Sequence, residues 1–218
     1  MASNNSSHFI AKFDTNFFER YARLTLIAKL GEDYANLFNA DRPDLQTEDK
    51  GFGVEVTRAI DEDKSVAKEL INEMAGKRIK ASARQEHDAL ESVESGYAYG
   101  LTDTWIGERE YDYWMLALPM RRIVASKVEK VAKGFYGEFK KYGLYVFTIQ
   151  NQTEVDIEAL IHYTIELQKH NKMHYDVLFI SQIDRLFVCD LTCGAYQSYN
   201  ISRAESREFY AKSLYNRE

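Results

Sequence analysis

The sequence predicts an α/β protein with a mixed β-sheet flanked by helices, and three observations support this fold class. After residue 119 the apolar pattern alternates between strand-like and helix-like segments, which is typical of α/β domains. Two short strand-like runs joined by turn residues come earlier in the chain. The 218 residues are 45% hydrophobic and include only two prolines, so residues 1–218 are expected to form a single domain with one substantial core.

The first half of the chain is expected to begin with a helix over residues 14–38, capped by Asp14 or Thr15. Two short strands follow, one over residues 44–47 and a clearer one over 52–60. The remaining segments are a helix over residues 62–75 and an acidic, aromatic segment over 81–119 that we interpret as an insertion or cap between the second strand and the next helix.

The second half shows a stronger pattern. Residues 120–142 carry apolar side chains at helical spacing, including Val124, Val128, Phe135 and Tyr142. After this basic helix the sequence predicts, in order, a strand over 143–150, a helix over 154–170, strands over 175–181 and 185–192, and a terminal helix over 202–215.

The charge is unevenly distributed, although the net charge is −6. Residues 121–142 hold seven Lys/Arg against two Glu, and residues 77–84 hold four basic residues and no acid. A basic stripe on an acidic body suits a phosphate backbone, whereas the alternative is that both segments are solvated helix faces. The candidate nucleic-acid contacts are Lys77, Arg78, Lys80, Arg84, Arg121, Arg122, Lys130 and Lys133.

No segment approaches the roughly 18 apolar residues that a membrane-spanning helix needs, so we expect no membrane association. The two cysteines, Cys189 and Cys193, are too few for a disulfide framework. We therefore expect reduced thiols and a cytoplasmic protein.

Two short stretches contain an acidic residue followed at the second position by lysine or a substitute for it. Glu48-Asp49-Lys50 gives the literal pattern, but three charged residues before a glycine are typical of an exposed hairpin turn. Glu55-Val56-Thr57 lacks the lysine but lies in the clearer strand. The second stretch is the better candidate for a catalytic site, because a carboxylate in a mostly buried strand needs a charged or polar partner.

Side-chain alternation places Glu55 and Thr57 on the face of the strand opposite to Val54 and Val56. The strand that contains Asp44 should lie beside it, because a tight turn links the two. Asp44 and Glu55 are therefore expected to point into one pocket.

A helix, then Pro43-Asp44 opening a strand, then a hairpin and the strand GVEVT resembles the PD-(D/E)xK nuclease superfamily, which has the restriction-endonuclease-like fold. The later order of basic helix, strand, helix, strand and strand also resembles that family's core. The resemblance covers most of the chain except residues 81–119.

The resemblance implies hydrolysis of DNA phosphodiesters with Mg²⁺ or Mn²⁺ as cofactor and DNA as partner, and a homodimer is compatible with it. It implies Asp44 and Glu55 as metal-binding acids and the carbonyl of Val56 as a third ligand. Members similar to Holliday-junction resolvases add a glutamate from the first helix, for which Glu19 is suitably placed. The alternative for Glu19 is an ordinary helix-surface pair with Arg23, four residues on.

Thr57 departs from the family pattern, which has lysine at this position to orient the water and stabilise charge. A lysine from a neighbouring helix can take its place. In the basic helix, Lys127 lies at the border between the apolar stripe and solvent, where a long side chain can reach a pocket at the sheet. We therefore predict Lys127 and Thr57 as catalytic residues beside Asp44 and Glu55. The competing hypothesis is a catalytically degenerate member of the family that acts as a nucleic-acid or protein interaction module.

Overall fold

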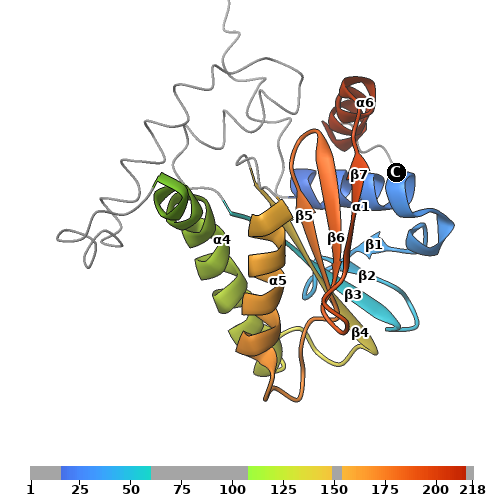
Figure 1. The fold of residues 1–218 in the computed structure, drawn as a ribbon. Coiled ribbons are helices and arrows are strands. Elements are labelled where there is room, and N and C mark those ends of the chain that lie inside the picture. Colours follow the sequence, from blue (N-terminus) through green and yellow to red (C-terminus); the bar gives the residue numbers. More distant parts are fainter. Residues whose placement is uncertain (1–15, 60–107, 149–153, 215–218) are drawn as a thin grey trace, which may run out of the picture.

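A computed structural model describes residues 16–59, 108–148 and 154–214. Within these ranges the chain forms one mixed sheet of seven strands with helices on both faces, which confirms the predicted α/β class (Figure 1). The strands are β1 (Phe38–Asn39), β2 (Leu45–Gln46), β3 (Phe52–Arg58), β4 (Lys141–Phe147), β5 (Val177–Ser181), β6 (Arg185–Asp190) and β7 (Tyr196–Asn200). The helices are α1 (Phe17–Leu30), the short 3-10 helix η2 (Glu32–Tyr34), α4 (Glu108–Ala132), α5 (Glu154–Gln168) and α6 (Arg203–Leu214).

The strands follow one another across the sheet in chain order. The three central strands, β3, β4 and β5, are parallel, and each outer pair is antiparallel. Parallel neighbours need a crossover connection, and α5 lies between β4 and β5 in the chain. Of the residues between β3 and β4, the structure describes α4 and the turn that follows it.

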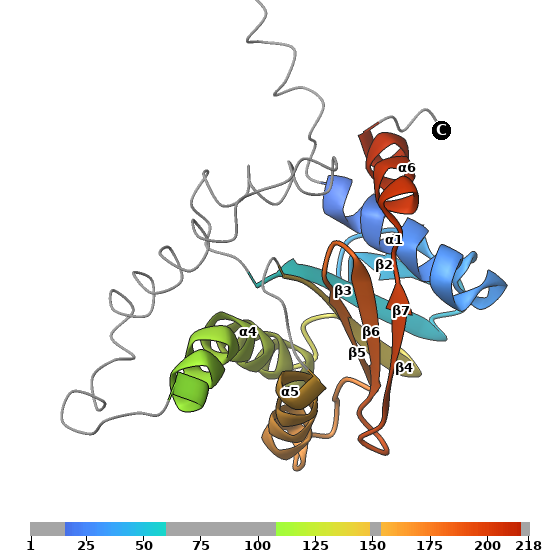
Figure 2. The same ribbon diagram turned by 45° about the horizontal axis from the view of Figure 1, so that its top comes forward.

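Helices α4 and α5 lie together on one face of the sheet, and α1 and α6 lie on the other (Figures 1 and 2). Each face has its own core. On the α4 side, Val124 and Val128 are buried in the same cluster as Leu144 of β4. On the α1 side, Leu26 is buried with Tyr145 of the same strand. Successive residues of β4 thus serve opposite cores, as strand alternation requires.

Polar contacts hold helix α6 against α1, although the two helices are distant in sequence. The guanidinium Nε of Arg20 donates to the carbonyl of Ser213 at 2.9 Å, and Lys29 Nζ lies 2.6 Å from Glu205 Oε1. These contacts fix α1 over the sheet edge that contains β1 and β2.

Two predicted helices are shorter in the structure than the sequence suggested. The first ends at Leu30 rather than at residue 38, because Gly31 adopts a φ of 92°. The helix expected over 120–142 ends at Ala132, so the prediction that Phe135 and Tyr142 lie on its face was wrong. Gly134 has a φ of 70° and the N–H of Phe135 bonds to the carbonyl of Lys130, which together form a Schellman-type helix end.

Other expectations fall partly outside the described residues. The helix predicted over 62–75 and residues 81–107 of the predicted insertion lie there, as do Asp14 and Thr15. Residues 108–119 belong to α4, continuous with 120–132. Strand β7 was not predicted, because its sequence, YQSYN, is polar and its side chains are half-buried or exposed.

The β2–β3 hairpin places the segment that contains Asp44 along the edge of β3. Leu45 pairs with Val54 in antiparallel register, and Glu48, Asp49 and Lys50 form the exposed turn, as predicted. In this turn Asp49 Oδ1 accepts hydrogen bonds from the Thr47 hydroxyl and the Gly51 N–H. The literal acid-lysine pattern is therefore part of the turn.

Gly53 allows the loop before β2 to pack closely on β3. A methyl group added here would lie 2.7 Å from Pro43 Cγ and 3.1 Å from the Phe139 ring. We expect Gly53→Ala to lower the free energy of unfolding by about 1–3 kcal/mol, since Pro43 must move. Urea denaturation measures this change. Gly31→Ala meets no atom within 4 Å and isolates the backbone cost of a positive φ, which Gly53 does not share. An unchanged free energy of unfolding in Gly53→Ala would contradict the close packing.

Candidate active site

Glu55 lies in the middle of β3 and is only 8% exposed. Its neighbour Val54 is buried in the core on the α1 side, so the Glu55 side chain points to the α4 side. A carboxylate in such a position requires a compensating charge or hydrogen bond.

Lys127 of α4 supplies that charge. Its Nζ lies 2.6 Å from Glu55 Oε1, and the two side chains are 15% and 10% exposed. Val124 and Val128, which flank Lys127 on the helix, are buried in the core beneath α4. The sequence position of Lys127 at the border of the apolar stripe therefore corresponds to its position in the structure.

Asp44 lies next to this pair. Its Oδ2 accepts a hydrogen bond from the Val56 N–H at 2.8 Å, and the pairing of Leu45 with Val54, extended by one residue, sets Asp44 opposite Glu55. Burial and the charge of Glu55 raise the pKa of the Asp44 carboxyl from its ordinary 3.8 to about 7. The Val56 N–H and the Lys127 ammonium oppose this rise in the pKa only partly.

The backbone of Val56 faces the same side as Asp44. Since the N–H and C=O of one strand residue point toward the same neighbour, the Val56 carbonyl also faces this edge, away from β4. Strand β2 ends its pairing at Leu45, so β3 has no paired residue opposite Val56 on that side. The Val56 carbonyl is therefore not used in the pairing of β3 with β2 or β4.

Glu19 of α1 is also near. Its charge contributes to the raised pKa of Asp44, and its Oε2 accepts a hydrogen bond from Asn39 Nδ2 at 2.8 Å. Arg23, the alternative partner considered for Glu19, donates instead to the backbone carbonyls of Leu37 and Ala35. Glu19 thus lies in the electrostatic environment of Asp44, on the N-terminal part of α1.

Two tyrosines near Glu55 were not identified from the sequence. Tyr136 and Tyr175 are 3% and 1% exposed, and neither hydroxyl makes a hydrogen bond of normal geometry within the described part of the chain. Burial, and next the charge of Glu55, raise the pKa of Tyr136, so its phenol is protonated at neutral pH and can donate. Tyr136 follows the unpredicted helix end at Gly134, which is why spacing along a helix could not indicate it.

The remaining predicted residues are less closely associated. Thr57 lies two residues beyond Glu55 on the same face of β3 and is half-buried. Arg122 and Lys130 are exposed on α4, and Lys133, just after this helix, is exposed and pairs with Glu129. Arg121 stacks over Tyr163 at 4.9 Å from the ring centroid. Lys77, Arg78, Lys80 and Arg84 lie outside the described residues.

The donor atoms at this position are oxygens of Asp44, Glu55, Glu19 and the Val56 carbonyl. Across residues 16–59, 108–148 and 154–214, no three acidic, histidine or cysteine side chains are already arranged around one point as a metal centre. In the conformation described, Glu55 is bonded to Lys127 and Asp44 to the Val56 N–H.

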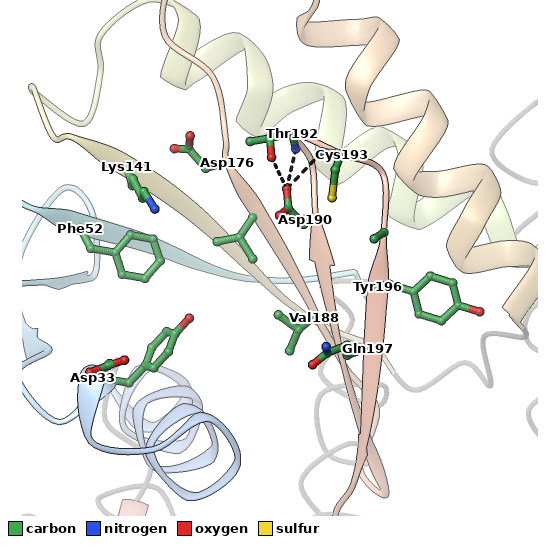
Figure 3. Close-up of a pocket in the computed structure, with 13 residues that line it drawn as sticks. Asp33, Phe52, Lys141, Asp176, Val188, Asp190, Thr192, Cys193, Tyr196 and Gln197 are labelled. Atoms are coloured by element: carbon green, nitrogen blue, oxygen red, sulfur yellow. Dashed lines mark hydrogen bonds between the residues drawn. The ribbon is translucent and has the colours of Figure 1, made fainter.

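A separate cavity of about 620 Å³ lies at the ends of the strands where Phe52, Lys141 and Val177 are located (Figure 3). Two of the three carboxylates that line it have structural partners: Asp190 Oδ1 accepts bonds from the Thr192 N–H and hydroxyl, and Asp176 Oδ2 accepts from the Tyr142 N–H. The third, Asp33, is exposed. Asp44 and Glu55 do not line this cavity. The cluster on β3 is therefore the stronger candidate for chemistry.

No helix in the described ranges is long and apolar enough to cross a membrane. Cys189 is buried, Cys193 is exposed, and both are free thiols. Comparison with protein-family models, curated proteins and solved structures finds no significant match to this chain.

The contact between Lys127 and Glu55 makes a testable contribution to stability. Lys127→Met would leave a buried carboxylate without its counter-charge, so we expect a loss of about 3 kcal/mol in the free energy of unfolding. The double variant Glu55→Gln/Lys127→Met should regain most of this loss. Lys133→Met, at an exposed pair at the end of the same helix, is the control and should change nothing measurable. Equal effects of the two single lysine variants in urea denaturation would contradict the buried pair.

The raised pKa of Asp44 predicts a pH-dependent stability. Below about pH 4 the carboxyl is protonated in both folded and unfolded chains, and between about pH 4 and 7 the folded chain alone retains the proton, so its stability falls as pH rises. We expect Asp44→Asn to be more stable than wild type at pH 8, by the order of 2 kcal/mol after allowance for solvent screening. At pH 4 the difference should vanish.

Thermal or urea unfolding in EDTA at the two pH values measures this effect. Asp156→Asn on α5 is a comparison variant remote from β3 in the chain, and it should not reproduce the gain at pH 8. A pH-independent difference between wild type and Asp44→Asn would show that Asp44 titrates normally.

Proposed function

We propose that the protein is a divalent-metal-dependent phosphodiesterase that hydrolyses DNA, as a divergent member of the PD-(D/E)xK superfamily with a restriction-endonuclease-like fold. The observation that carries the proposal is the contact of Lys127 Nζ with Glu55 at 2.6 Å, beside Asp44. Lys127 brings an ammonium from α4 to Glu55. In the proposed enzyme it would take the role that the family gives to a lysine at the position of Thr57. Asp44 directly precedes β2, Glu55 lies in β3, and the cation comes from a helix that covers this face of the sheet.

The residues present fit a hard divalent cation. Their donor atoms are carboxylate and carbonyl oxygens, which Mg²⁺ and Mn²⁺ prefer. Burial, and then the charges of Glu55 and Glu19, raise the pKa of Asp44, and a bound cation would offset this accumulation of negative charge. Asp44, Glu55 and the Val56 carbonyl would hold the ion, with Glu19 assisting. A bound ion lowers the pKa of a water molecule and neutralises charge on phosphate oxygens.

The protein's own groups would handle the water and the phosphate. Lys127 has three N–H donors, of which one is directed at Glu55, so the others can orient the attacking water or a phosphate oxygen. The protonated Tyr136 hydroxyl is a further donor near Glu55. Hydrolysis adds water across a P–O ester bond, and the ammonium would stabilise charge that develops on the phosphate oxygens.

A second function is favoured by one specific observation. Glu55 and Lys127 already satisfy each other, and the described acids are not preassembled around a point. A catalytically degenerate protein would have the same contact as a structural ion pair and would act as a nucleic-acid or protein interaction module. Cleavage and metal binding distinguish this candidate from the nuclease.

The nuclease proposal predicts cleavage of plasmid or linear DNA in Mg²⁺ or Mn²⁺ but not in EDTA. We expect Glu55→Gln and Lys127→Met each to reduce the rate at least about 100-fold, since each removes a charged group from the site of phosphate chemistry. Gel electrophoresis of the products measures the rate. Circular dichroism and unfolding curves of the same preparations show which variants are folded.

The matched control is Glu166→Gln, an exposed glutamate on α5, which should cleave DNA like wild type. Wild-type activity in folded Glu55→Gln would exclude this site as the source of cleavage. If wild type neither cleaves DNA nor binds Mn²⁺ by calorimetry, the interaction module is the correct function.

A further inference from the structure

Phe135 is an exposed aromatic side chain on the rim of the candidate active site. It is 47% exposed and follows directly after the Gly134 helix end. Large apolar side chains at such exposure are few in the described ranges, the others being Phe38 and Leu167. The ring is held at the surface by the backbone conformation at the end of α4.

Two cations from different elements lie against this ring. Arg42 Cζ is 5.1 Å from the ring centroid, and Lys130 Nζ is 5.5 Å from it. Arg42 is largely exposed, and its ion pair with exposed Asp41 is long at 3.6 Å. Both cations are therefore available to a ligand that approaches Phe135.

The ring and its cations adjoin the candidate catalytic residues. Arg42 is separated from Asp44 by a single residue, and Lys130 lies one helical turn after Lys127. Tyr136, whose ring packs edge-to-face on Phe135 at 5.4 Å, is the buried tyrosine near Glu55. Phe135 therefore contacts Arg42, Lys130 and Tyr136, each of which is close to a residue of the candidate site.

A second ring on the same loop, Phe139, lies near a cation of the β2–β3 turn. Lys50 Nζ lies 6.0 Å from the centroid of half-buried Phe139, and the Lys140 N–H bonds to the Lys50 carbonyl at 3.1 Å. The loop after α4 is therefore attached to the β2–β3 hairpin. Alternating aromatic rings and cations are the features that bind single-stranded nucleic acid, where bases stack and phosphates are neutralised.

We propose that Phe135 is a stacking platform for an unpaired nucleobase, with Arg42 and Lys130 contacting the adjoining phosphates. The inference rests on the proposed nuclease function and names its substrate class: DNA with a single-stranded segment next to the cleaved phosphodiester. A base on the ring would displace one of the two cations toward the backbone. Bases inside a duplex are already stacked on their neighbours and would not present a free face.

Binding in EDTA tests the inference without cleavage. The probe is a fluorescein-labelled single strand of about 20 nucleotides, compared by anisotropy with the blunt duplex of the same sequence. We expect the single strand to bind at least about tenfold more tightly, and Phe135→Ala to weaken that binding roughly tenfold. Phe135→Trp should retain it, and Phe135→Leu, which keeps the apolar bulk, should lose it as Phe135→Ala does.

Controls separate stacking from charge and from general surface effects. Leu167→Ala removes a different exposed apolar side chain, on α5, and should bind single-stranded DNA like wild type. Arg42→Ala and Lys130→Ala should each reduce the slope of log affinity against log salt concentration by about 1, which corresponds to the loss of one phosphate contact. Equal binding of single strand and duplex, equal binding by wild type and Phe135→Ala, or no binding of either DNA would overturn the platform; the last result would favour a protein partner at Phe135.

The cleavage assay is scored separately. If wild type cleaves DNA but Phe135→Ala binds and cleaves single-stranded and duplex substrates as wild type does, the nuclease function stands and the platform fails. If no metal supports cleavage but single-strand binding depends on Phe135, the platform stands and the nuclease function fails.

Discussion

The contact between Glu55 and Lys127 is the constraint on which the arrangement of this protein depends. A carboxylate in the middle of a central strand is tolerable only if a cation approaches it from the covering helix. The packing of Val124 and Val128 sets α4 at the depth where Lys127 reaches β3. The short hairpin then brings Asp44 to the same carboxylate, so two strands and one helix are oriented by a single cluster of charges.

The parts of this cluster that depend only on residues close in sequence could be predicted, and the parts that depend on the end of α4 could not. Strand alternation separates Glu55 from Val54 and Val56, and the turn at residues 48–50 is apparent from its charges and glycine. The border position of Lys127 needs only the helical repeat. Tyr136 could not be predicted, because its approach to Glu55 depends on the left-handed conformation of Gly134, which breaks the repeat that the apolar residues continue. Strand β7 was missed because an edge strand with polar side chains has no apolar alternation to detect.

The buried acids of the site oppose stability. Burial is the largest cause of the raised pKa of Asp44, and the charges of Glu55 and Glu19 add to it, while the charge of Lys127 opposes it. Repulsion of this kind is common at functional sites, where stability is lower than the same fold would permit. The Val56 N–H holds Asp44 in place despite this repulsion, and close packing of Pro43 on Gly53 supports the same segment.

The helix end at Gly134 directs two consecutive aromatic side chains in opposite directions. Phe135 faces solvent and Tyr136 faces the interior near Glu55, and one peptide unit joins them. Because the two rings pack edge-to-face at 5.4 Å, a ligand that immobilises the outer ring also restricts motion of the inner one. In the proposed nuclease, binding energy gained at Phe135 would help to order the Tyr136 hydroxyl near Glu55, so that a surface contact would affect turnover as well as affinity.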